Sequence, residues 1–161
     1  MQIVLTDKAK GFTILEVIVV IAIIGIVTAV VIAGFNQSSN TLAVSVDILK
    51  AHIRYAQSRA MNSVAGWGVK GADDGKSYWL FKNGDPSNHI IRAPGEDENS
   101  IDLDKKDLSL SSFVVSFDNR GIPCSDTFGS SPLTSNLSIT ITSNNGGSFV
   151  VIITKNTGFI Q

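Results

Sequence analysis

Three residues near the amino terminus combine a glycine–aromatic junction with a charge in an unusual place. Gly11 precedes Phe12, and Glu16 is the only charged residue between Phe12 and Phe35. A carboxylate inside such an apolar run costs free energy, so an ionisable group there is a functional hypothesis by default. We therefore expect Glu16 to have a function that an ordinary membrane anchor would not need.

The apolar segment from Phe12 to Phe35 has the length of a membrane span. Its 24 residues would form about 36 Å of helix, against a hydrocarbon core of about 30 Å. Sixteen are Phe, Ile, Leu or Val, so insertion gains on the order of 5 to 10 kcal/mol, more than the roughly 3 kcal/mol that Glu16 costs. Thirteen are Val or Ile, which favour strands in water, but lipid favours a helix because a helix pairs its backbone groups internally. A transmembrane helix is predicted.

Two simpler interpretations of this segment stay open. A secretory signal peptide has an apolar region of about 7 to 15 residues and then a small-residue cleavage site. The segment is longer than that, although residues 31–33 before Gly34 form a weak site of this kind. A plain anchor fits the length but gives Glu16 no role. Lys8 and Lys10 place the residues before the apolar segment in the cytoplasm by the positive-inside bias.

The amino terminus resembles the class III leader of type IV pilins and type II secretion pseudopilins. The resemblance rests on Gly11, Phe12 and Glu16, with Thr-Ile-Leu between the last two. It implies that prepilin peptidase cleaves between Gly11 and Phe12, and that the new terminus Phe12 is N-methylated. It also implies that Glu16 is the family's fifth-position glutamate, which meets the amine of a neighbouring subunit and sets the axial register. Low dielectric strengthens that attraction, and pairing within one chain stays open.

Composition limits the possibilities for the chain beyond Phe35. The remaining 126 residues suit one modest domain. Cleavage would remove two lysines and one aspartate from the 13 basic and 14 acidic residues, which leaves a formal charge of −2 and does not favour a polyanionic partner.

Cys124 is the only cysteine, so the chain can form no intramolecular disulfide. We expect Cys124 to be a small, partly buried residue, with a link between subunits as the alternative.

A second helical pattern comes after the apolar segment. Apolar residues recur at spacings of three or four: Leu42, Val46, Leu49, Ile53, Ala56, Ala60 and Val64. This stripe predicts an amphipathic helix over residues 36–65, which ends at Gly66 and Gly68. The two predicted helical segments, residues 12–35 and 36–65, follow each other without a gap and together predict one continuous helix, a rod of about 50 residues. The rod has three points at which it could bend or melt: Gly25, Gly34 and residues 36–40.

From Lys76 the apolar period changes to two. This period predicts six β-strands, at residues 77–82, 88–92, 101–103, 108–118, 137–143 and 148–154. The last two would form a hairpin across residues 144–147. Residues 149–153 are apolar on both faces, which is typical of a central strand.

The predicted fold is α+β, with a long amino-terminal helix packed against an all-β, antiparallel, pilin-like head. Four regions are predicted: residues 1–11 as leader, 12–35 as transmembrane or filament-core helix, 36–65 as amphipathic helix and 66–161 as β-rich head. Arg54 and Arg59 late in the helix, residues 117–121 in the head and a terminal hairpin ending near Gly158 occur in the same order as in one known group. This order resembles the GspH/FimT group of minor pseudopilins and minor pilins.

Catalysis has few candidate residues in this sequence. The two histidines are predicted to lie on a helix face, His52, and in a short strand, His89. The sequence has no nucleophile motif, no phosphate-binding loop and no zinc-ligand spacing. We therefore expect a protein that is not an enzyme and that uses no cofactor and no metal.

An acidic run offers one metal alternative. It consists of Glu96, Asp97, Glu98, Asp102, Asp104 and Asp107. Carboxylates this dense could hold calcium, but the run has no D-x-[DN]-x-[DN]-G pattern and contains Lys105 and Lys106. A solvated loop and edge strand is the favoured interpretation.

The resemblance implies a structural function. The chain would be a minor subunit at or near the tip of a type II secretion pseudopilus or a type IV pilus. Its partners would be other pilins or pseudopilins, prepilin peptidase and the inner-membrane assembly platform. It would cross the bacterial inner membrane once, with its head in the periplasm or outside the cell.

A receptor is the alternative function, in which the filament presents a head that binds DNA during uptake or an exported substrate. DNA binding needs clustered Lys or Arg to neutralise phosphates. From Gly121 to Gln161 the only basic residue is Lys155, which opposes this function. A basic patch assembled in space from three arginines stays open: Arg54, Arg59 and Arg120.

Overall fold

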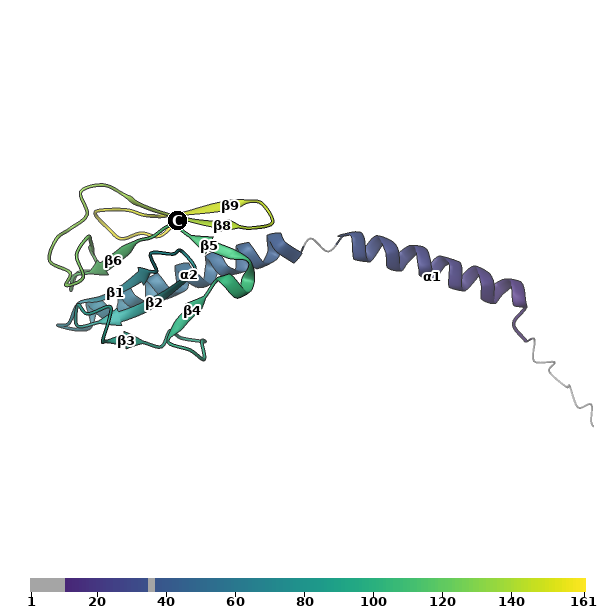
Figure 1. Ribbon diagram of the computed structural model, residues 1–161, viewed down its shortest axis with the longest axis horizontal. Helices are drawn as coiled ribbons and strands as arrows, with labels where there is room; N and C mark the ends of the chain where they lie inside the picture. The colour runs from purple at the N-terminus through teal and green to yellow at the C-terminus, as the bar shows by residue number, and fades with distance from the viewer. Residues whose placement is uncertain (1–10, 35–36) are drawn as a thin grey trace, which may run out of the picture. The chain divides into compact units, whose positions relative to one another are not determined.

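The computed structural model describes residues 11–34 and 37–161 (Figure 1). The chain divides into two compact units, Met1–Asn36 and Gln37–Gln161, and each is described by itself. The described part of the first unit holds one helix, and the second unit holds a helix followed by antiparallel strands. The predicted α+β class, with an amino-terminal helix before a head of antiparallel sheets, is confirmed. Apart from Gly11, the predicted leader 1–11 lies outside the described residues.

Helix α1 extends over Ile14–Gly34 and begins with a side-chain cap. The backbone N–H of Glu16 donates to Thr13 Oγ1 at 3.2 Å, and the N–H of Val17 donates to the Thr13 carbonyl at 3.3 Å. A threonine in this position satisfies one of the N–H groups that the first helical turn leaves without a partner. The helical form predicted for this Val- and Ile-rich segment is therefore confirmed for Ile14–Gly34.

Within residues 11–34 and 37–161, no helix combines the length and the apolarity that a bilayer crossing requires. The transmembrane assignment of residues 12–35 stays a prediction from the sequence. Gly25 does not interrupt α1, and the helix ends at Gly34. The join between Gly34 and Gln37 lies outside the described residues, so the single rod of about 50 residues also stays a prediction.

Helix α2 extends over Gln37–Met61, and the polar run after residue 36 is therefore helical from Gln37 onward. The predicted stripe is confirmed in its first six members, all buried: Leu42, Val46, Leu49, Ile53, Ala56 and Ala60. The seventh member was wrong, since Val64 lies beyond the end of the helix and is fully exposed.

The strands of the head form two antiparallel sheets. The first sheet has the order β3-β2-β1-β6-β7, with β4 also paired to β2, and the second has the order β5-β8-β9. The bounds are β1 Trp67–Gly71, β2 Ser77–Lys82, β3 Ile90–Ile91, β4 Ser100–Asp102, β5 Leu108–Leu110, β6 Val114–Phe117, β7 Pro123–Cys124, β8 Leu137–Ser143 and β9 Ser148–Ile153, with a 3-10 turn, η1, at Asp104–Lys106.

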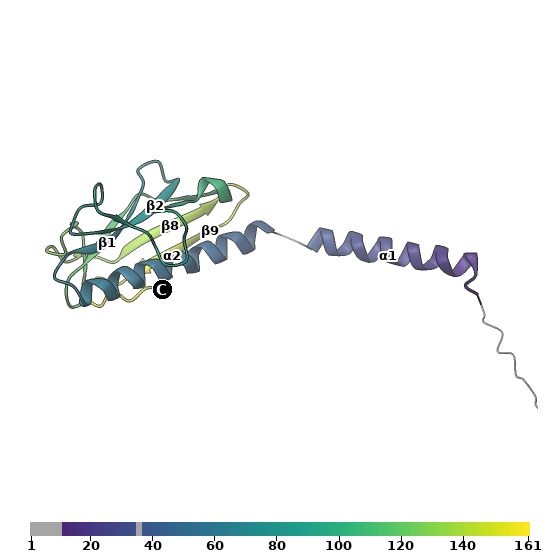
Figure 2. The same ribbon diagram turned by 90° about the horizontal axis from the view of Figure 1, so that it is seen from below.

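Helix α2 lies along both sheets (Figure 2) and contacts β1, β6, β8 and β9. Its stripe packs against buried side chains of each sheet, among them Val69 and Phe117 of the first and Ile139 and Val151 of the second. All members of this core come from residues 42–160. The second unit therefore closes a hydrophobic core with its own residues and has what it needs to fold without the first unit.

Two predictions about the first sheet were wrong. Gly66 and Gly68 were expected only to end the helix, and no strand was predicted there. Residues Trp67–Gly71 form β1, which lies at the centre of the sheet between β2 and β6. Its Gly68 serves close packing, because a Cβ there would collide with the carbonyl oxygen of Val115 and the ring of Phe81. The second missed strand is β7, which is two residues long.

The predicted strand 108–118 is two strands that belong to different sheets. Strand β5 pairs with β8 in the second sheet, and β6 pairs with β1 in the first. Between them the N–H of Ser111 donates to the Thr140 carbonyl, while the carbonyl of Phe113 accepts from Gly71, so the chain changes partner within three residues. Apolar residues recur with a period of two on both sides of this change, but their phase shifts by one residue between Leu110 and Phe113, so the period alone did not reveal the break.

The carboxy-terminal hairpin of β8 and β9 is confirmed. Strand β8 has the predicted bounds, and β9 ends one residue earlier than predicted. The central position predicted for residues 149–153 was wrong, because β9 is an edge strand of the three-stranded sheet. Its apolar residues on both faces are explained only in part by burial, since Phe149 and Val150 are exposed.

Candidate functional site

The predicted cleavage junction is open to solvent. Gly11, Phe12 and Thr13 precede the first turn of α1 without regular secondary structure. The Phe12 side chain is 82% exposed, and a Cβ built on Gly11 would meet no atom within 4 Å among the described residues. The junction therefore has the accessibility that a peptidase substrate requires.

Glu16 lies in the first turn of α1, three residues after the capping threonine. The spacing Thr-x-x-Glu is that of a capping box, in which the threonine side chain accepts from the backbone N–H of the glutamate. Glu16 is exposed, and it makes no ion pair within the described residues. A carboxylate in the first turn also interacts favourably with the positive end of the helix dipole. Sequence reasoning missed this local role, although the Thr-x-x-Glu spacing carries the signal.

The two roles of Glu16 differ in the atoms they use. Capping uses the backbone N–H of Glu16, whereas register pairing would use its carboxylate. An amine released at Phe12 would lie at the positive end of the same helix, where a cation is disfavoured. A carboxylate from the same or a neighbouring chain would relieve that cost, so the geometry permits the pairing implied by the resemblance.

The surface of α1 is apolar on every side. Large aliphatic side chains from Ile14 to Val30 are exposed around the whole helix. A helix that is apolar all round is normally covered by lipid or by other protein. Among the described residues of the first unit nothing covers these side chains.

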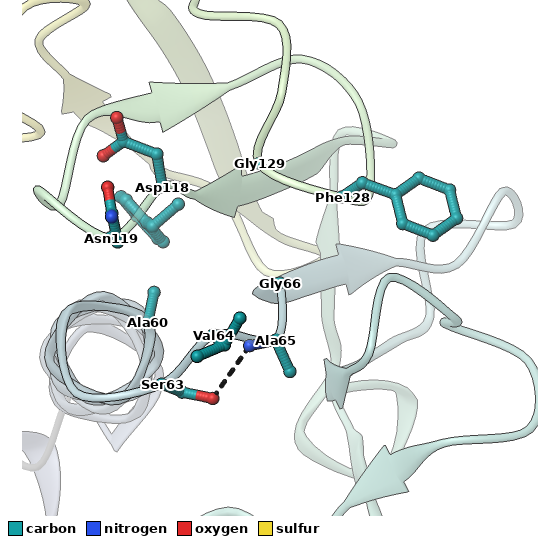
Figure 3. Close-up of a pocket in the computed structure, with 10 residues that line it drawn as sticks. Ala60, Ser63, Val64, Ala65, Gly66, Asp118, Asn119, Phe128 and Gly129 are labelled. Atoms are coloured by element: carbon teal, nitrogen blue, oxygen red, sulfur yellow. Dashed lines mark hydrogen bonds between the residues drawn. The ribbon is translucent and has the colours of Figure 1, made fainter.

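In the head, a cavity of about 250 Å³ lies at the carboxyl end of α2 (Figure 3). Asp118 and Asn119 lie beside the helix end with the polar ends of their side chains pointing away from it, and the ring of Phe128 also points away from it. Among the lining residues, Asp118 is the only titratable group, and its carboxylate already accepts from the N–H groups of Arg120 and Ile122. Burial alone would raise the pKa of Asp118, but these N–H groups and the Arg120 guanidinium hold it below its ordinary value. This cavity brings together no catalytic groups.

His52 lies on a face of α2, as predicted. The sequence did not predict that its side chain is buried and that both ring nitrogens are hydrogen-bonded. Its Nδ1 is 2.9 Å from the Tyr78 hydroxyl, and its Nε2 is 3.2 Å from the Pro94 carbonyl oxygen. Because the carbonyl can only accept, Nε2 carries the proton and Nδ1 accepts from Tyr78. Burial lowers the pKa of His52 and raises that of Tyr78. The neutral histidine therefore joins α2 to β2 and to the loop before β4.

His89 is exposed and lies one residue before β3, next to the predicted strand position. Its Nδ1 is 3.2 Å from Asp85 Oδ2. The same carboxylate accepts from the side-chain amide of Asn88 and from the backbone N–H groups of Asn88 and Ser87, and these hydrogen bonds hold the pKa of Asp85 low. His89 and Asp85 therefore stabilise a turn, and this turn is separate from the hydrogen bonds of His52.

The acidic run is exposed at four of its six residues, half-buried at Glu96 and Asp102, and interleaved with lysines. Lys105 Nζ lies 3.4 Å from Asp102 and 4.0 Å from Glu98, and Lys76 Nζ lies 3.2 Å from Asp104. In the part of the chain that the structure describes, no group of three or more acidic, histidine or cysteine side chains is arranged to hold a metal ion. The favoured interpretation, a solvated loop and edge strand, agrees with this arrangement.

The three arginines of the open DNA alternative are each engaged separately. Arg54 donates to the Ile160 carbonyl at 3.1 Å, and Arg120 pairs with Asp118 at 3.0 Å. The Arg59 guanidinium lies 5.1 Å from the ring centroid of Trp67 and 5.9 Å from that of Tyr55. Contacts of this kind hold each arginine against its own neighbours.

Cys124 is completely buried, more so than expected from the sequence. Burial raises the pKa of its thiol to about 11, so the reactive thiolate is scarce at neutral pH. A disulfide between subunits would need this strand to open. Its behaviour is that of a small core residue.

Comparison with known families finds one match, at the amino terminus. Residues 6–32 match the family described as "Prokaryotic N-terminal methylation motif". No characterised protein and no solved structure is significantly similar to the chain. The matched residues include Gly11, Phe12 and Glu16 and most of α1. This prepilin-type motif supports membership of a type IV pilin-like family, and it implies processing by prepilin peptidase and assembly with other pilins.

Proposed function

We propose that this chain is a minor pilin or minor pseudopilin of the GspH/FimT group. It is a structural subunit of a type II secretion pseudopilus or a type IV pilus, without enzymatic activity. The observation that carries the proposal is the methylation motif at residues 6–32, which coincides with an exposed Gly11–Phe12 junction and an all-round apolar helix. The first unit supplies the assembly surface, and the second is the head that a filament would present.

Maturation begins with cleavage between Gly11 and Phe12 and N-methylation of Phe12. Before assembly, residues 12–35 hold the chain in the inner membrane, with Lys8 and Lys10 on the cytoplasmic side. The head then lies in the periplasm or, after assembly, outside the cell. During assembly, Glu16 pairs with the amine at Phe12 of a neighbouring subunit on the inner-membrane platform. Support comes from the exposed carboxylate of Glu16 in the first turn of α1.

A structural role also fits the head. Its buried histidine, its buried cysteine and the carboxylate in its cavity are all engaged in holding the fold. The receptor alternative, with DNA or an exported substrate as ligand, has no supporting cluster among the described arginines. We therefore propose partners that are other pilins or pseudopilins.

Intact mass and amino-terminal sequencing test the proposal. The protein is isolated from membranes of a host with prepilin peptidase and, in parallel, from a host without it. The expected result is N-methylated Phe12 in the first host and the uncleaved chain in the second. A terminus at Met1 in both hosts would leave a plain anchor, and a terminus at Gly34 would identify a signal peptide; either result contradicts the proposal.

A further inference from the structure

The outer edge of β9 is closed over only half of its length. The last residues of the chain pair with it: Gln161 donates to the Ile152 carbonyl at 3.0 Å and accepts from the Ile152 N–H at 3.4 Å. The N–H of Thr154 donates to the Phe159 carbonyl at 3.0 Å. The backbone groups of Ile152 therefore point away from β8, toward the edge.

The other half of this edge, from Ser148 to Val151, has no strand beside it among the described residues. Backbone groups in an antiparallel strand alternate between the two sides, so Ser148 and Val150 point outward, as Ile152 does. Among residues 11–34 and 37–161, these outward groups of Ser148 and Val150 have no hydrogen-bond partner. The side chains of Phe149 and Val150 are 50% and 51% exposed. Outward backbone groups and two large apolar side chains are thus left for an external strand.

Nothing in the sequence of this hairpin protects the open edge. Natural proteins shield edge strands with charged side chains, proline or bulges. Residues 143–154 contain no charged residue and no proline, and the pairing of β8 with β9 runs without a bulge. The edge is therefore suited to pairing, and an uncharged strand meets no repulsion from a copy of itself.

We propose that this edge binds the same edge of a second copy of the chain, as an antiparallel pair of β9 strands. The two-fold axis passes between the Phe149 residues, so Ser148 of each copy faces Val150 of the other. Both of these pairs exchange two hydrogen bonds, which uses all the outward groups of Ser148 and Val150 in each copy. The second copy fits better than a longer strand because the hairpin turn at Gly147 and the paired Gln161 limit the open stretch at both ends.

The side chains also match in this register. Phe149 faces Phe149 of the other copy in a pair without hydrogen bonds, the type in which opposite Cβ atoms come closest, about 4.5 Å. Aromatic pairs across strands add to the stability of a sheet. The two β5-β8-β9 sheets would continue as one, and the proposal concerns the head alone, so it does not depend on cleavage at Gly11.

Cysteine cross-linking in the full-length protein, in membranes, tests the register. Single variants Ser148→Cys, Phe149→Cys and Val150→Cys are exposed to mild oxidation. The native protein, whose Cys124 is buried, is treated in parallel to measure cross-linking that does not come from the introduced cysteines. Opposed Cβ atoms at this spacing are close enough for a disulfide. We expect a dimer from Phe149→Cys alone, and from Ser148→Cys mixed with Val150→Cys, but little from either of those two alone. Ser138→Cys, exposed on β8, is the matched control.

A second pair of variants tests the hydrogen bonds in the isolated head, residues 37–161, whose core is closed. Val150→Pro removes only an outward N–H, which an edge strand tolerates, whereas Val150→Thr keeps it. Sedimentation should show a concentration-dependent dimer for the native head and Val150→Thr, and at least about tenfold weaker association for Val150→Pro, the scale of lost hydrogen bonds. Equal melting temperatures establish that the variants are folded.

Three outcomes overturn the proposal. They are a head that stays monomeric at every concentration, cross-linking that is equally efficient at positions 138, 148, 149 and 150, and a Phe149→Cys cross-link to a different protein in place of a second copy.

Discussion

The two helices of this chain differ in what covers their apolar side chains. Helix α2 confines them to one stripe, and both sheets of the head bury that stripe. Helix α1 carries them on every side, and within its own unit they are exposed. The difference shows that α2 is covered by its own chain, whereas the described residues of the first unit leave α1 uncovered; the proposed function assigns that surface to lipid or other subunits. Changes in α2 should therefore affect stability, and changes at the start of α1 should affect processing and assembly.

The largest expected effect comes from Gly11→Val, which should abolish cleavage. The resemblance to prepilin leaders implies that the peptidase requires glycine at this position. Because a Cβ at Gly11 would meet no described atom, a larger residue should leave the fold intact. The measurement is intact mass from membranes of a host with prepilin peptidase. Gly25→Val is the matched control, since Gly25 in α1 also has open space around it and should not affect cleavage. A normal mature mass for Gly11→Val would refute the assigned site.

The comparison of the helices is sharpened by Leu49→Ala in α2. Leu49 is completely buried, so the substitution should lower the free energy of unfolding of the head by about 3 kcal/mol. Val44→Ala, on the exposed side of the same helix, should change it by less than about 0.5 kcal/mol. Chemical denaturation of residues 37–161 measures both. Equal losses would show that the stripe does not carry the stability of the head.

Glu16→Ala separates the two roles of the first turn of α1. The cap uses the backbone N–H of residue 16, so the variant keeps the hydrogen bond to Thr13 and loses only the carboxylate. We expect normal insertion and cleavage but severalfold reduced incorporation into filaments, measured in the sheared filament fraction. Thr13→Ala is the converse variant, which removes the cap at a cost of about 1 kcal/mol to the helix and keeps the carboxylate. Normal incorporation of Glu16→Ala would count against register pairing.

The smallest expected effect is a pH dependence in the head. Burial lowers the pKa of His52 in the folded state, so between its folded pKa and the ordinary value of about 6.5 the unfolded chain binds more protons. Stability should be constant above about pH 7 and decrease as pH falls below about 6.5. Denaturation midpoints of the head between about pH 8 and pH 5 measure this. His52→Gln should flatten the decrease, and an unchanged slope would assign it to other groups.

The sequence predicted those elements whose pattern is local. The stripe of α2 and strand β8 have the expected periods, because one face of each packs on the core along its length. The start of α1 carries a local signal as well, the Thr-x-x-Glu spacing of Thr13 and Glu16, which the predictions from the sequence did not use. Local rules were enough wherever neighbouring residues share one environment.

The features that the sequence did not reveal depend on contacts between distant residues. Strand β1 contains Gly68 and Gly71, which favour a stop, yet its place is fixed by the close approach of Val115 and Phe81 to Gly68. The burial of His52 depends on Tyr78 and Pro94, which are 26 and 42 residues away. No periodicity in the sequence marks partners at such separations.

The two ends of the chain have opposite fates. The first residues are proposed to be removed, whereas the last ones complete a sheet: Ile160 is buried, Arg54 bonds to its carbonyl, and Gln161 pairs with Ile152. Loss of Ile160 and Gln161 would therefore remove backbone hydrogen bonds that close part of the β9 edge. The turn at Gly95, where added atoms meet open space, is the better place to attach a label for following this subunit in cells.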